Sequence, residues 1–413
     1  MTLSEELSWR GFVNQTTFGD LKALDKKKWV FYHGFDASAD SQTVGNLAAM
    51  MLDKLFLRHG HHGIILAGGA TSLVGDPGGK DTERPLQDEK TIAANVARAE
   101  AQLKKILSGQ EFKLVNNLAW TKSMTVIEFL RDVGKHFSMT PLVQRDYIAK
   151  RLGEGGAGIS YAEFSYTILQ GYDYLHLYDK YNVTLQLGGS DQWGNCLSGV
   201  ELVRKARGQE VHVITLPLII NKATGKKFGK TEEGAIWLDP AKTSVFKFYQ
   251  FWLNSDDDSV SDYLKIFTEL DKDEIAGLMK GFEKNRSERS AQKKLAYEVT
   301  KTVHGQTKAE SVRRITSVLF SDAPISDIKR EDVNQLKNEL PHIQFKAGAT
   351  IAEAVVKTGL ASSLSEARRL IDQGGIHLNS LRVDSGQTLK QDDRQAGGAV
   401  LLKRGKNLFA LID

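Results

Sequence analysis

The turn "GFDASADSQTVGN", at residues 34–46, combines glycines, acids and an amide in a way that could hold an anionic ligand. Gly34 and Gly45 allow the backbone to approach a ligand closely. The apolar-periodic segment that begins at Val44 predicts a helix, and the first N–H groups of a helix can bind a phosphate. A glycine-containing turn between a strand and a helix is more often only a turn, so the pattern alone leaves both interpretations open.

A second loop, "GGATSLVGDPGGKDTER" at 68–84, places charged residues after a buried apolar run. Asp76 precedes a proline, and Lys80 and Arg84 add two cations. A solvated loop and a ligand site are equally good interpretations of this loop by itself.

The segment "LQLGGSDQWGN", at 185–195, repeats this arrangement after another strand-like run. A Gly–Gly pair ends the run, and Ser190, Asp191 and Gln192 follow. These side chains could form hydrogen bonds with sugar hydroxyls or a nucleobase.

The segment "EFSYTILQGYDY" predicts a helix in which Tyr166, Gln170 and Asp173 share one face, because they lie at i, i+4 and i+7. Such a face is costly to bury without partners. The residues alone leave two possibilities open, a satisfied network in the core and a ligand site.

The segment "NKATGKKFGKTEEG", at 221–234, interleaves Lys226, Lys227 and Lys230 with glycines. It contains too much glycine for a stable helix. A mobile basic loop suits a polyphosphate, although a lysine-rich loop is often only solvated surface.

The elements that must position these residues alternate along the first half of the chain. Apolar runs of strand length precede or follow longer helical patterns, at 29–35, 63–69, 112–117, 183–189 and 211–220. Strands that are apolar throughout and alternate with helices indicate a parallel sheet covered on both faces. Ligands bind outside the carboxyl ends of such strands, and the polar clusters follow those ends. After about residue 240 the pattern becomes helical, and two helices, a Gly–Gly stop and a β-like run follow from about 347.

The composition is that of an ordinary globular protein, with 41% hydrophobic and 26% charged residues among 413. The formal charge of +4 permits a polyanionic partner without requiring one. The first residues do not resemble a signal peptide, and the longest apolar run, "VITLPLII", is too short to span a membrane. A single cysteine, Cys196, excludes an intrachain disulfide. We therefore expect a cytoplasmic protein without a membrane partner.

Together these segments resemble the bacterial tyrosyl-tRNA synthetases, a family of class I aminoacyl-tRNA synthetases. The resemblance extends from "GFVNQTT" to "LLKRGKN", and it is specific because unrelated motifs occur in the family's order. "YHGFDASADSQTVGN" is similar to the nucleotide-binding turn, and "KFGKT" to the Lys-Met-Ser-Lys-Ser loop of the family.

The resemblance implies an α/β fold, with a Rossmann-like parallel-sheet catalytic domain over 1–235 that includes a mobile loop at 221–235. An α-helical anticodon-binding domain over 236–340 and a small α+β S4-like RNA-binding domain over 343–413 would follow. An insertion at about 118–155 would make most of the contact in a homodimer.

The resemblance also implies the activity of a tyrosine–tRNA ligase. L-tyrosine and ATP would form tyrosyl-adenylate and pyrophosphate, and the tyrosyl group would pass to the 3′ end of tRNA(Tyr). Mg²⁺ would accompany ATP, and we expect no protein-bound metal because the sequence shows no cage of ligands for one.

The site residues are carried over by position in the family's motifs. The residues implied for catalysis are Thr43, Asn46, Lys227, Lys230 and Thr231. Those implied for tyrosine binding are Tyr32, Asp36, Thr71, Asp76, Asn117, Tyr166, Gln170, Asp173 and Gln192. Those implied for ATP binding are Gly34, Gly45, Gly189, Asp191, Lys227 and Lys230. Tyr32 and Asp173 match the pair that meets the phenolic hydroxyl, and phenylalanine would leave both buried and unpaired.

One departure concerns residues 43–46, where the family usually has His-Ile-Gly-His and this chain has Thr-Val-Gly-Asn. The hydroxyl of Thr43 can donate a hydrogen bond, but it is shorter than histidine and never cationic. We expect either a shifted loop or weaker adenylate formation. A synthetase-like RNA-binding protein with weakened catalysis is therefore one alternative, and a tryptophan-specific class I synthetase is another. Tyr32 and Asp173 argue against the latter, because both suit a phenol.

The C-terminal segment predicts contacts with RNA phosphates. A serine at 363 or 365 can cap a helix that Gly374 and Gly375 end. The residues implied for RNA binding are Arg368, Arg369, Lys403 and Arg404. Deleting 343–413 should therefore weaken binding of tRNA and spare adenylate formation.

Overall fold

The computed structural model describes residues 1–76, 87–222, 225, 228–231, 234–321, 323–384, 386–395 and 397–413. The chain packs as two compact units. The first comprises 1–243 and 255–295, and the second comprises 244–254 and 296–413. No helix in the described part of the chain is long and apolar enough to cross a membrane. The three domain boundaries expected from the sequence remain a prediction.

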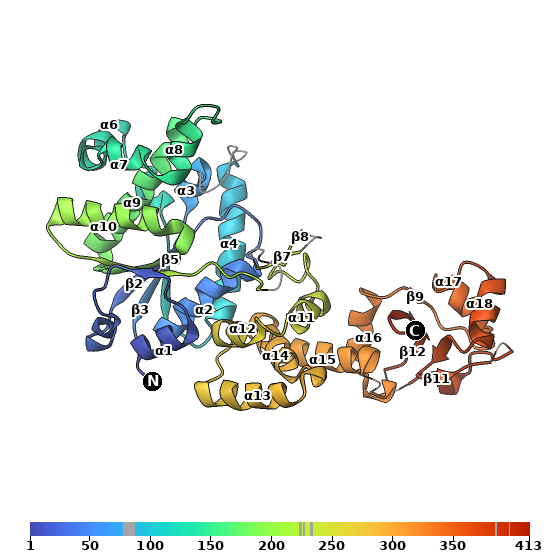
Figure 1. Cartoon of the computed structure of the whole chain (residues 1–413). Coiled ribbons are helices and arrows are strands. Elements are labelled where there is room, and N and C mark those ends of the chain that lie inside the picture. The colour runs from blue at the N-terminus through green and yellow to red at the C-terminus, as the bar shows by residue number, and fades with distance from the viewer. Residues whose placement is uncertain are drawn as a thin grey trace. The chain divides into compact units, whose positions relative to one another are not determined.

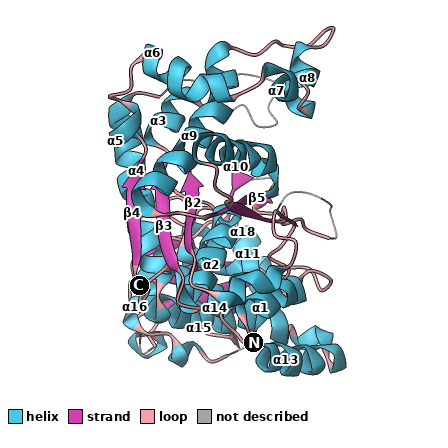
Figure 2. Cartoon of the chain, turned by 90° about the vertical axis from the view of Figure 1, so that its left-hand side faces the viewer, coloured by secondary structure: helices cyan, strands magenta, loops and turns pink. Residues whose placement is uncertain are grey.

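A six-stranded sheet forms the centre of the first unit. Its strands lie in the order β1-β6-β5-β2-β3-β4, and every neighbouring pair is parallel except β1 with β6. Figure 2 shows the arrows of β4, β3 and β2 running side by side in one direction. The bounds are β1 (Gln15–Thr16), β2 (Val30–Phe35), β3 (His62–Ala67), β4 (Phe112–Asn116), β5 (Leu185–Gly189) and β6 (His212–Leu216).

The predicted parallel sheet is confirmed, and it carries one strand that the sequence analysis missed. The antiparallel edge strand β1 has only two residues. A strand of this length is too short to show alternation of apolar and polar residues, so it has no periodic signal.

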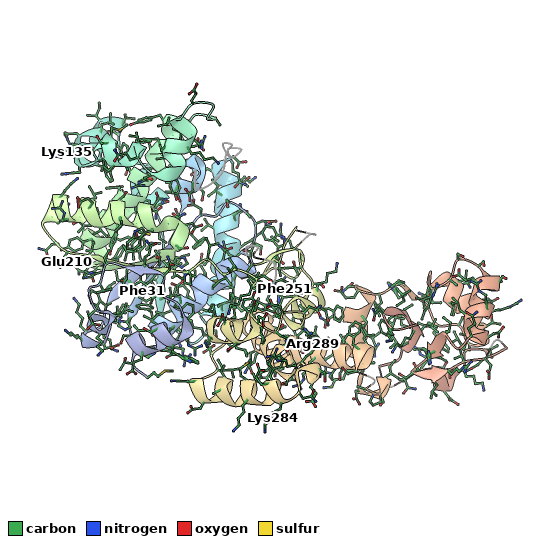
Figure 3. All side chains as sticks on the ribbon, in the orientation of Figure 1. Phe31, Lys135, Glu210, Phe251, Lys284 and Arg289 are labelled. Carbon is green, nitrogen blue, oxygen red and sulfur yellow. The ribbon has the colours of Figure 1, made fainter. Side chains whose placement is uncertain are left out.

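Helices cover both faces of the sheet because successive strand residues point to opposite faces. The ring of Tyr32 lies 5.0 Å from that of Tyr174 in α9 (Tyr161–Tyr181). The ring of Phe31 lies 5.2 Å from that of Phe56 in α2 (Val44–Arg58), on the opposite face. In Figure 1, α9 and α10 (Trp193–Arg207) lie on one side of the sheet and α2 on the other. Phe31, labelled in Figure 3, lies among the side chains of this core and is fully buried.

The remaining elements of the first unit are shorter or lie at its periphery. Their bounds are α1 (Leu3–Arg10), η1 (Leu21–Lys26), α3 (Gly69–Val74), α4 (Glu89–Ile106), η4 (Ser190–Gln192), β7 (Lys230–Thr231), β8 (Gly234–Ala235), α12 (Val260–Phe267), α13 (Lys272–Lys284) and η5 (Arg286–Glu288).

The segment between β4 and α9 differs from the sequence-based expectation. The sequence predicts one helix through 125–137, whereas the chain forms a π-helical turn and a 3₁₀ turn after a single α-helical turn. Gly134 weakens the α-helix here, and a π turn shifts the register of the helix. The bounds are α5 (Leu118–Thr121), α6 (Val126–Glu128), η2 (Phe129–Val133), η3 (Gly134–His136), α7 (Met139–Val143) and α8 (Asp146–Leu152).

The second unit combines helices with a five-stranded sheet in the order β11-β10-β12-β13-β9. The helical region and the two C-terminal helices agree with the sequence-based expectation, and Gly374 ends the second helix with a φ of +71°. The bounds are α11 (Val245–Leu253), α14 (Ser290–His304), α15 (Gln306–Phe320), η6 (Ile325–Asp327), α16 (Arg330–Lys337), β9 (His342–Ile343), α17 (Ile351–Lys357), α18 (Leu364–Asp372), β10 (Ile376–Leu378), β11 (Leu381–Arg382), η7 (Gln391–Asp393), β12 (Val400–Arg404) and β13 (Leu408–Ile412). Of these, α14 begins in the first unit.

The two faces of the C-terminal sheet bury different partners. Leu402 and Ala410 belong to a core with α17 and α18. Leu401 and Phe409, their neighbours in the strands, belong to a core with Ile315 of α15 and with α16. The C-terminal sheet therefore shares a hydrophobic core with the helices that precede it.

Candidate active site

A cavity of about 380 Å³ opens at the carboxyl ends of β2, β3, β5 and β6. The carboxyl ends of parallel strands meet at one edge of a sheet, which brings distant segments of the sequence together. The predicted site residues that line this cavity are Tyr32, Gly34, Asp36, Thr43, Gly45, Asn46, Thr71, Asp76, Tyr166, Gln170, Asp173, Gly189, Asp191 and Gln192.

Asp173 is a buried carboxyl on the inward face of α9. One of its oxygens accepts a hydrogen bond from Asn117 Nδ2 at 2.9 Å, and the other accepts one from Trp120 Nε1 at 2.9 Å. Burial raises the pKa of Asp173 to about 7, although these two donors lower it. Asp173 can therefore change between its neutral and ionised forms near neutral pH.

Two other buried polar atoms of residues that line the cavity have no hydrogen-bond partner among the described residues. They are the hydroxyl of Tyr32, whose side chain is 1% exposed, and Oε1 of Gln170. Burial raises the pKa of Tyr32 well above its usual value, so the hydroxyl stays protonated. Because unpaired buried polar atoms are rare, this part of the cavity is suited to a ligand that supplies the missing partners.

Asp36 connects the wall of the cavity to Asp173 through hydrogen bonds. It accepts one from Thr71 Oγ1 at 2.7 Å and one from the hydroxyl of Tyr166 at 2.8 Å. Thr71 Oγ1 in turn accepts one from Asn117 Nδ2 at 3.2 Å. Asn117 is not a lining residue of the cavity, and its contacts with Thr71 and Asp173 place it directly behind the wall.

A second set of hydrogen bonds orients Gln192. Its Nε2 donates to Asp76 at 2.8 Å, and its Oε1 accepts from Asn195 Nδ2 at 3.0 Å. Asn195 Oδ1 accepts from Thr167 at 2.7 Å and from Arg145 at 3.2 Å. These contacts hold the amide of Gln192 in one orientation at the edge of the cavity.

The N-terminus of α2 forms the opposite part of the cavity wall. Asn46 Oδ1 accepts hydrogen bonds from the backbone N–H of Thr43 at 3.0 Å and from its hydroxyl at 2.8 Å. A Cβ at Gly45 would meet only Thr43 Oγ1, at 3.5 Å. The first turn of α2 is therefore open, and the hydroxyl of Thr43 is occupied by Asn46.

Gly189 makes room for Asp191 at the end of β5. A Cβ at Gly189 would lie 2.5 Å from Asp191 Oδ1, so a side chain there would displace the carboxylate of Asp191. Asp191 is exposed at the cavity rim, where it could meet a ligand hydroxyl.

The segment around β7 and β8 lies against the start of α2. Val44 N–H donates to Ile236 O at 3.0 Å, and Ile236 N–H donates to Gly229 O at 3.1 Å. A Cβ at Gly229 would lie 2.5 Å from Val44 Cγ2. Outside the described residues lie Lys80, Arg84, Lys226 and Lys227, and only the backbone is described for Lys230 and Thr231. The contacts with a triphosphate that the sequence predicts for Lys227 and Lys230 remain predictions.

The predicted RNA-binding residues lie in the second unit. Ser363 is the N-cap of α18, and Arg368 and Arg369 are exposed on that helix. Lys403 Nζ lies over the ring of Phe409, and Arg404 donates to the backbone oxygen of Leu360. Arg404 thus also connects β12 to the α17–α18 region.

Three residues at this site were not predicted from the sequence, namely His33, Asp53 and Trp120. Trp120 donates to Asp173, and His33 lines the cavity while it contacts the buried Asp53 of α2. A single indole N–H produces no repeating pattern in the sequence, so spacing could not reveal Trp120. The alternation of side chains along β2 predicts only the face of the sheet on which His33 lies.

Comparison with known proteins identifies the family. Residues 24–321 match class I tRNA synthetases of the tryptophan and tyrosine group, and residues 332–412 match an SYY-like C-terminal domain of tyrosine–tRNA ligases. The chain is 42% identical over 421 residues to tyrosine–tRNA ligase 2 of Bacillus cereus and 43% identical over 421 residues to tyrosine–tRNA ligase of Bacillus caldotenax. Each alignment covers 100% of this chain and 99% of the relative.

The chain belongs to the class I tyrosyl-tRNA synthetases.

A solved structure agrees with this membership. A C-terminally truncated mitochondrial tyrosyl-tRNA synthetase of Aspergillus nidulans superposes with a TM-score of 0.70 and 32% identity, over 77% of this chain and 94% of that one. The tyrosyl-tRNA synthetase family, the class I catalytic fold and the aminoacyl-tRNA synthetase activity expected from the sequence are thereby confirmed. The tryptophan alternative is not favoured, because the relatives that match over the full length are tyrosine–tRNA ligases.

Proposed function

We propose that the cavity binds L-tyrosine and ATP side by side and that the chain joins tyrosine to tRNA(Tyr) through tyrosyl-adenylate. The observation that carries this proposal is the buried pair of Tyr32 and Asp173. A phenolic hydroxyl can accept a hydrogen bond from the hydroxyl of Tyr32 and donate one to the carboxylate of Asp173.

The rest of the tyrosine site follows from charge. The α-ammonium group of tyrosine requires acceptors, and we propose that Asp76, Tyr166 and Gln170 supply them. All three line the cavity, and Oε1 of Gln170 is buried without a partner in the described part of the chain. Asp36, Thr71 and Asn117 would then hold Tyr166 and Asp173 in position through the hydrogen bonds between them.

The first step is an in-line displacement at phosphorus. A carboxylate oxygen of tyrosine forms a bond to the α-phosphorus of ATP, and the bond from that phosphorus to the bridging oxygen of the β-phosphate breaks. Pyrophosphate leaves with the electron pair. The substrate supplies the nucleophile, so the enzyme contributes position and charge stabilisation.

The nucleotide would lie along the start of α2 and the end of β5. We propose that Gly34, Gly45, Asn46 and Gly189 leave room for the adenosine and phosphates, and that Asp191 binds the ribose. Lys227, Lys230 and Thr231 would close over the triphosphate, where lysine cations neutralise the leaving pyrophosphate. Mg²⁺ would enter with ATP, bound to its phosphates.

The second step transfers the tyrosyl group to RNA. A hydroxyl of the terminal adenosine attacks the tyrosyl carbonyl, an ester bond forms, and AMP leaves. We propose that Arg368 and Arg369 contribute phosphate contacts to the tRNA, with Lys403 and Arg404 nearby in β12.

We also propose that the chain acts as a homodimer. Large apolar side chains are exposed in the segment between β4 and α9, with Val126 at 72%, Ile127 at 68% and Met139 at 58%. A group of exposed apolar side chains is typical of a protein interface. This is the insertion to which the family resemblance assigns the contact.

The experiment that tests the proposed function is ATP–pyrophosphate exchange with the purified chain. We expect exchange with tyrosine and much less with phenylalanine or tryptophan. Phenylalanine leaves the buried Tyr32 and Asp173 unpaired, and tyrosyl-tRNA synthetases are themselves the known example of this discrimination, which reaches about 10⁵-fold. Equal exchange with phenylalanine would contradict the assigned specificity, and exchange with tryptophan alone would favour the rival family member.

A further inference from the structure

One face of α4 holds the turn before α2 from behind, through contacts that the proposed reaction does not use. Asn95, Arg98 and Gln102 share this face because they lie at i, i+3 and i+7. Asn95 Nδ2 donates a hydrogen bond to Ala37 O at 3.0 Å, and Arg98 Nη1 lies 3.4 Å from Asp40 Oδ2. The polar face of α4 therefore follows the turn along its course towards α2.

Gln102 forms two hydrogen bonds with the turn, one through each end of its amide. Its Oε1 accepts a hydrogen bond from the backbone N–H of Gln42 at 3.0 Å, and its Nε2 donates one to Ser41 Oγ at 2.9 Å. Ser41 is 4% exposed and Gln42 is 5% exposed, so little water reaches these groups. Removal of either partner would leave buried polar groups unpaired, which is costly.

The hydroxyl of Ser41 also contacts the segment that follows β8. Ser41 Oγ accepts a hydrogen bond from the backbone N–H of Asp239 at 3.2 Å and donates one to Gln42 O at 2.9 Å. Together with the bond from Gln102, these contacts use the donor and both acceptor positions of the hydroxyl. Ser41 therefore joins three elements, which are α4, the turn before α2 and the segment after β8.

The segment after β8 also pairs with the turn through its backbone. Thr43 and Trp237 form an antiparallel bridge, and Leu238 N–H donates to Gln42 O at 2.9 Å. The hydroxyl of Ser41 extends this pairing by one residue. Because the segment directly follows the β7–β8 hairpin, these bonds fix the spacing between the turn and that hairpin.

An exposed ion pair joins the same elements and is the weaker connection. Asp40 Oδ1 lies 2.5 Å from Lys242 Nζ, but the two side chains are 40% and 33% exposed. Exposed ion pairs contribute little because water screens the charges. The buried bonds of Ser41 and Gln102 are therefore the main connection between the turn, α4 and the segment after β8.

We propose that Ser41 and Gln102 are positioning residues for adenylate formation. They hold the turn before α2 at a fixed distance from the β7–β8 hairpin, so that both elements approach the same ATP molecule. Ser41 and Gln102, both within the described part of the chain, do not line the cavity themselves, and they act through Gln42 and Thr43, which do. The inference rests on the proposed function of the cavity.

The test compares Ser41→Ala and Gln102→Met in the exchange reaction. We expect each substitution to lower kcat/KM for ATP about tenfold, because the turn loses its buried partners, and to leave the KM for tyrosine within about twofold. The matched control is Ser311→Ala, which removes a buried hydroxyl that donates to Asp332 in the second unit. The control should lower thermal stability and leave kcat/KM for ATP and the KM for tyrosine unchanged.

A double-mutant cycle tests the contact between the two side chains. If Ser41 and Gln102 act through one contact, the double variant should lose about as much kcat/KM for ATP as the more impaired single variant. Losses that multiply in the double variant would show independent effects and would overturn the proposal. Equal losses of kcat/KM for ATP and for tyrosine would also overturn it, because they would indicate a general loss of structure. If Ser41→Ala does not fold, Gln102→Met, at a half-buried position, provides the same comparison.

Calorimetric titration with ATP, in the absence of tyrosine, separates this inference from the proposed function. Absence of tyrosine-dependent exchange in the wild type would overturn the proposed function. Weaker ATP binding by Ser41→Ala and Gln102→Met would still support the positioning role, and unchanged ATP binding would then overturn it. With an active wild type, unchanged exchange kinetics in both variants would overturn the positioning role alone.

Discussion

At the scale of single residues, Asp173 is the group through which we expect the proposed tyrosine site to respond to pH. Its pKa of about 7 results from burial, against which Asn117 and Trp120 each donate one hydrogen bond. A phenolic hydroxyl donates a stronger hydrogen bond to the ionised carboxylate than to the neutral acid. Tyrosine binding therefore favours deprotonated Asp173, which predominates above pH 7.

We expect the KM for tyrosine to fall about tenfold between pH 6 and pH 8, since one pKa unit corresponds to a factor of ten. The α-ammonium and α-carboxylate of tyrosine do not titrate in this range. Exchange kinetics at saturating ATP measure the effect. The matched variant is Asn117→Ala, which removes a donor that lowers the pKa of Asp173 and should move the fall to higher pH. A flat profile would contradict the role of Asp173.

Thr43 is one of the residues at which this chain departs from the usual motif of its family. Its hydroxyl donates to Asn46 Oδ1, so it holds the first turn of α2 as well as facing the cavity. We expect Thr43→Ala to slow adenylate formation about tenfold, the effect of about one lost hydrogen bond, with nearly unchanged tyrosine affinity. Single-turnover adenylate formation is the measurement, and Thr43→Ser, which retains the hydroxyl, is the control. An unchanged rate in Thr43→Ala would remove Thr43 from the site.

At the scale of elements, the segment around β7 and β8 contacts the start of α2. Gly229 has a φ of +81°, and a Cβ there would also collide with Val44. Gly225, in the same segment, has a φ of +67° and nothing within 4 Å of an added Cβ. The two glycines therefore differ in contact and share the backbone conformation that disfavours other residues.

We expect Gly229→Ala to reduce the rate of adenylate formation at least tenfold and to leave tyrosine affinity unchanged, because it displaces the loop from α2. Gly225→Ala is the matched control. It should lose only the local stability that the strained backbone costs, about 1–2 kcal/mol. The single-turnover rate of adenylate formation and the equilibrium affinity for tyrosine, both measured for each variant, distinguish the two effects. Equal losses in both variants would show that backbone strain, and not the contact with Val44, is responsible.

At the scale of the whole molecule, we propose that the exposed apolar side chains between β4 and α9 contact a second copy of the chain. We expect Ile127→Asp to convert a homodimer into monomers, because burying an unpaired carboxylate in an interface is costly. Analytical ultracentrifugation measures the oligomeric state. Leu381→Asp is the matched control, since Leu381 is 72% exposed in the other unit. A dimer that tolerates Ile127→Asp would place the interface elsewhere.

The shared core of the second unit changes how the C-terminal segment should be tested. Deleting 343–413 would remove Leu401 and Phe409 from the core that they form with Ile315, and it would expose that core. Substitutions on the exposed face of α18 avoid this problem, because Arg368 and Arg369 contribute nothing to the hydrophobic core.

We expect Arg368→Glu with Arg369→Glu to raise the KM for tRNA at least tenfold in aminoacylation and to spare pyrophosphate exchange. The loss should shrink as salt increases, because phosphate contacts are screened. Lys180→Glu, a charge reversal on the exposed surface of α9, is the control. Loss of exchange in the double variant would contradict this division of function between the two units.

The sequence by itself determined the features that depend on local spacing. Continuous apolar runs of strand length and repeats of 3.6 residues revealed the strands and helices, and i, i+4, i+7 spacing placed Tyr166, Gln170 and Asp173 on one face of α9. The order of unrelated motifs revealed the family. These features could be predicted because backbone geometry relates neighbours in sequence to neighbours in space within one element.

Only the tertiary structure decided the features that depend on distances between elements. The raised pKa of Asp173, the hydrogen bond from Trp120 and the contact of His33 with Asp53 each join residues from different elements. The two-residue strand β1 and the core shared by the C-terminal sheet and α15 also depend on contacts between elements. Burial and hydrogen bonding depend on which groups the fold brings within a few ångströms, and no local pattern in the sequence records that distance.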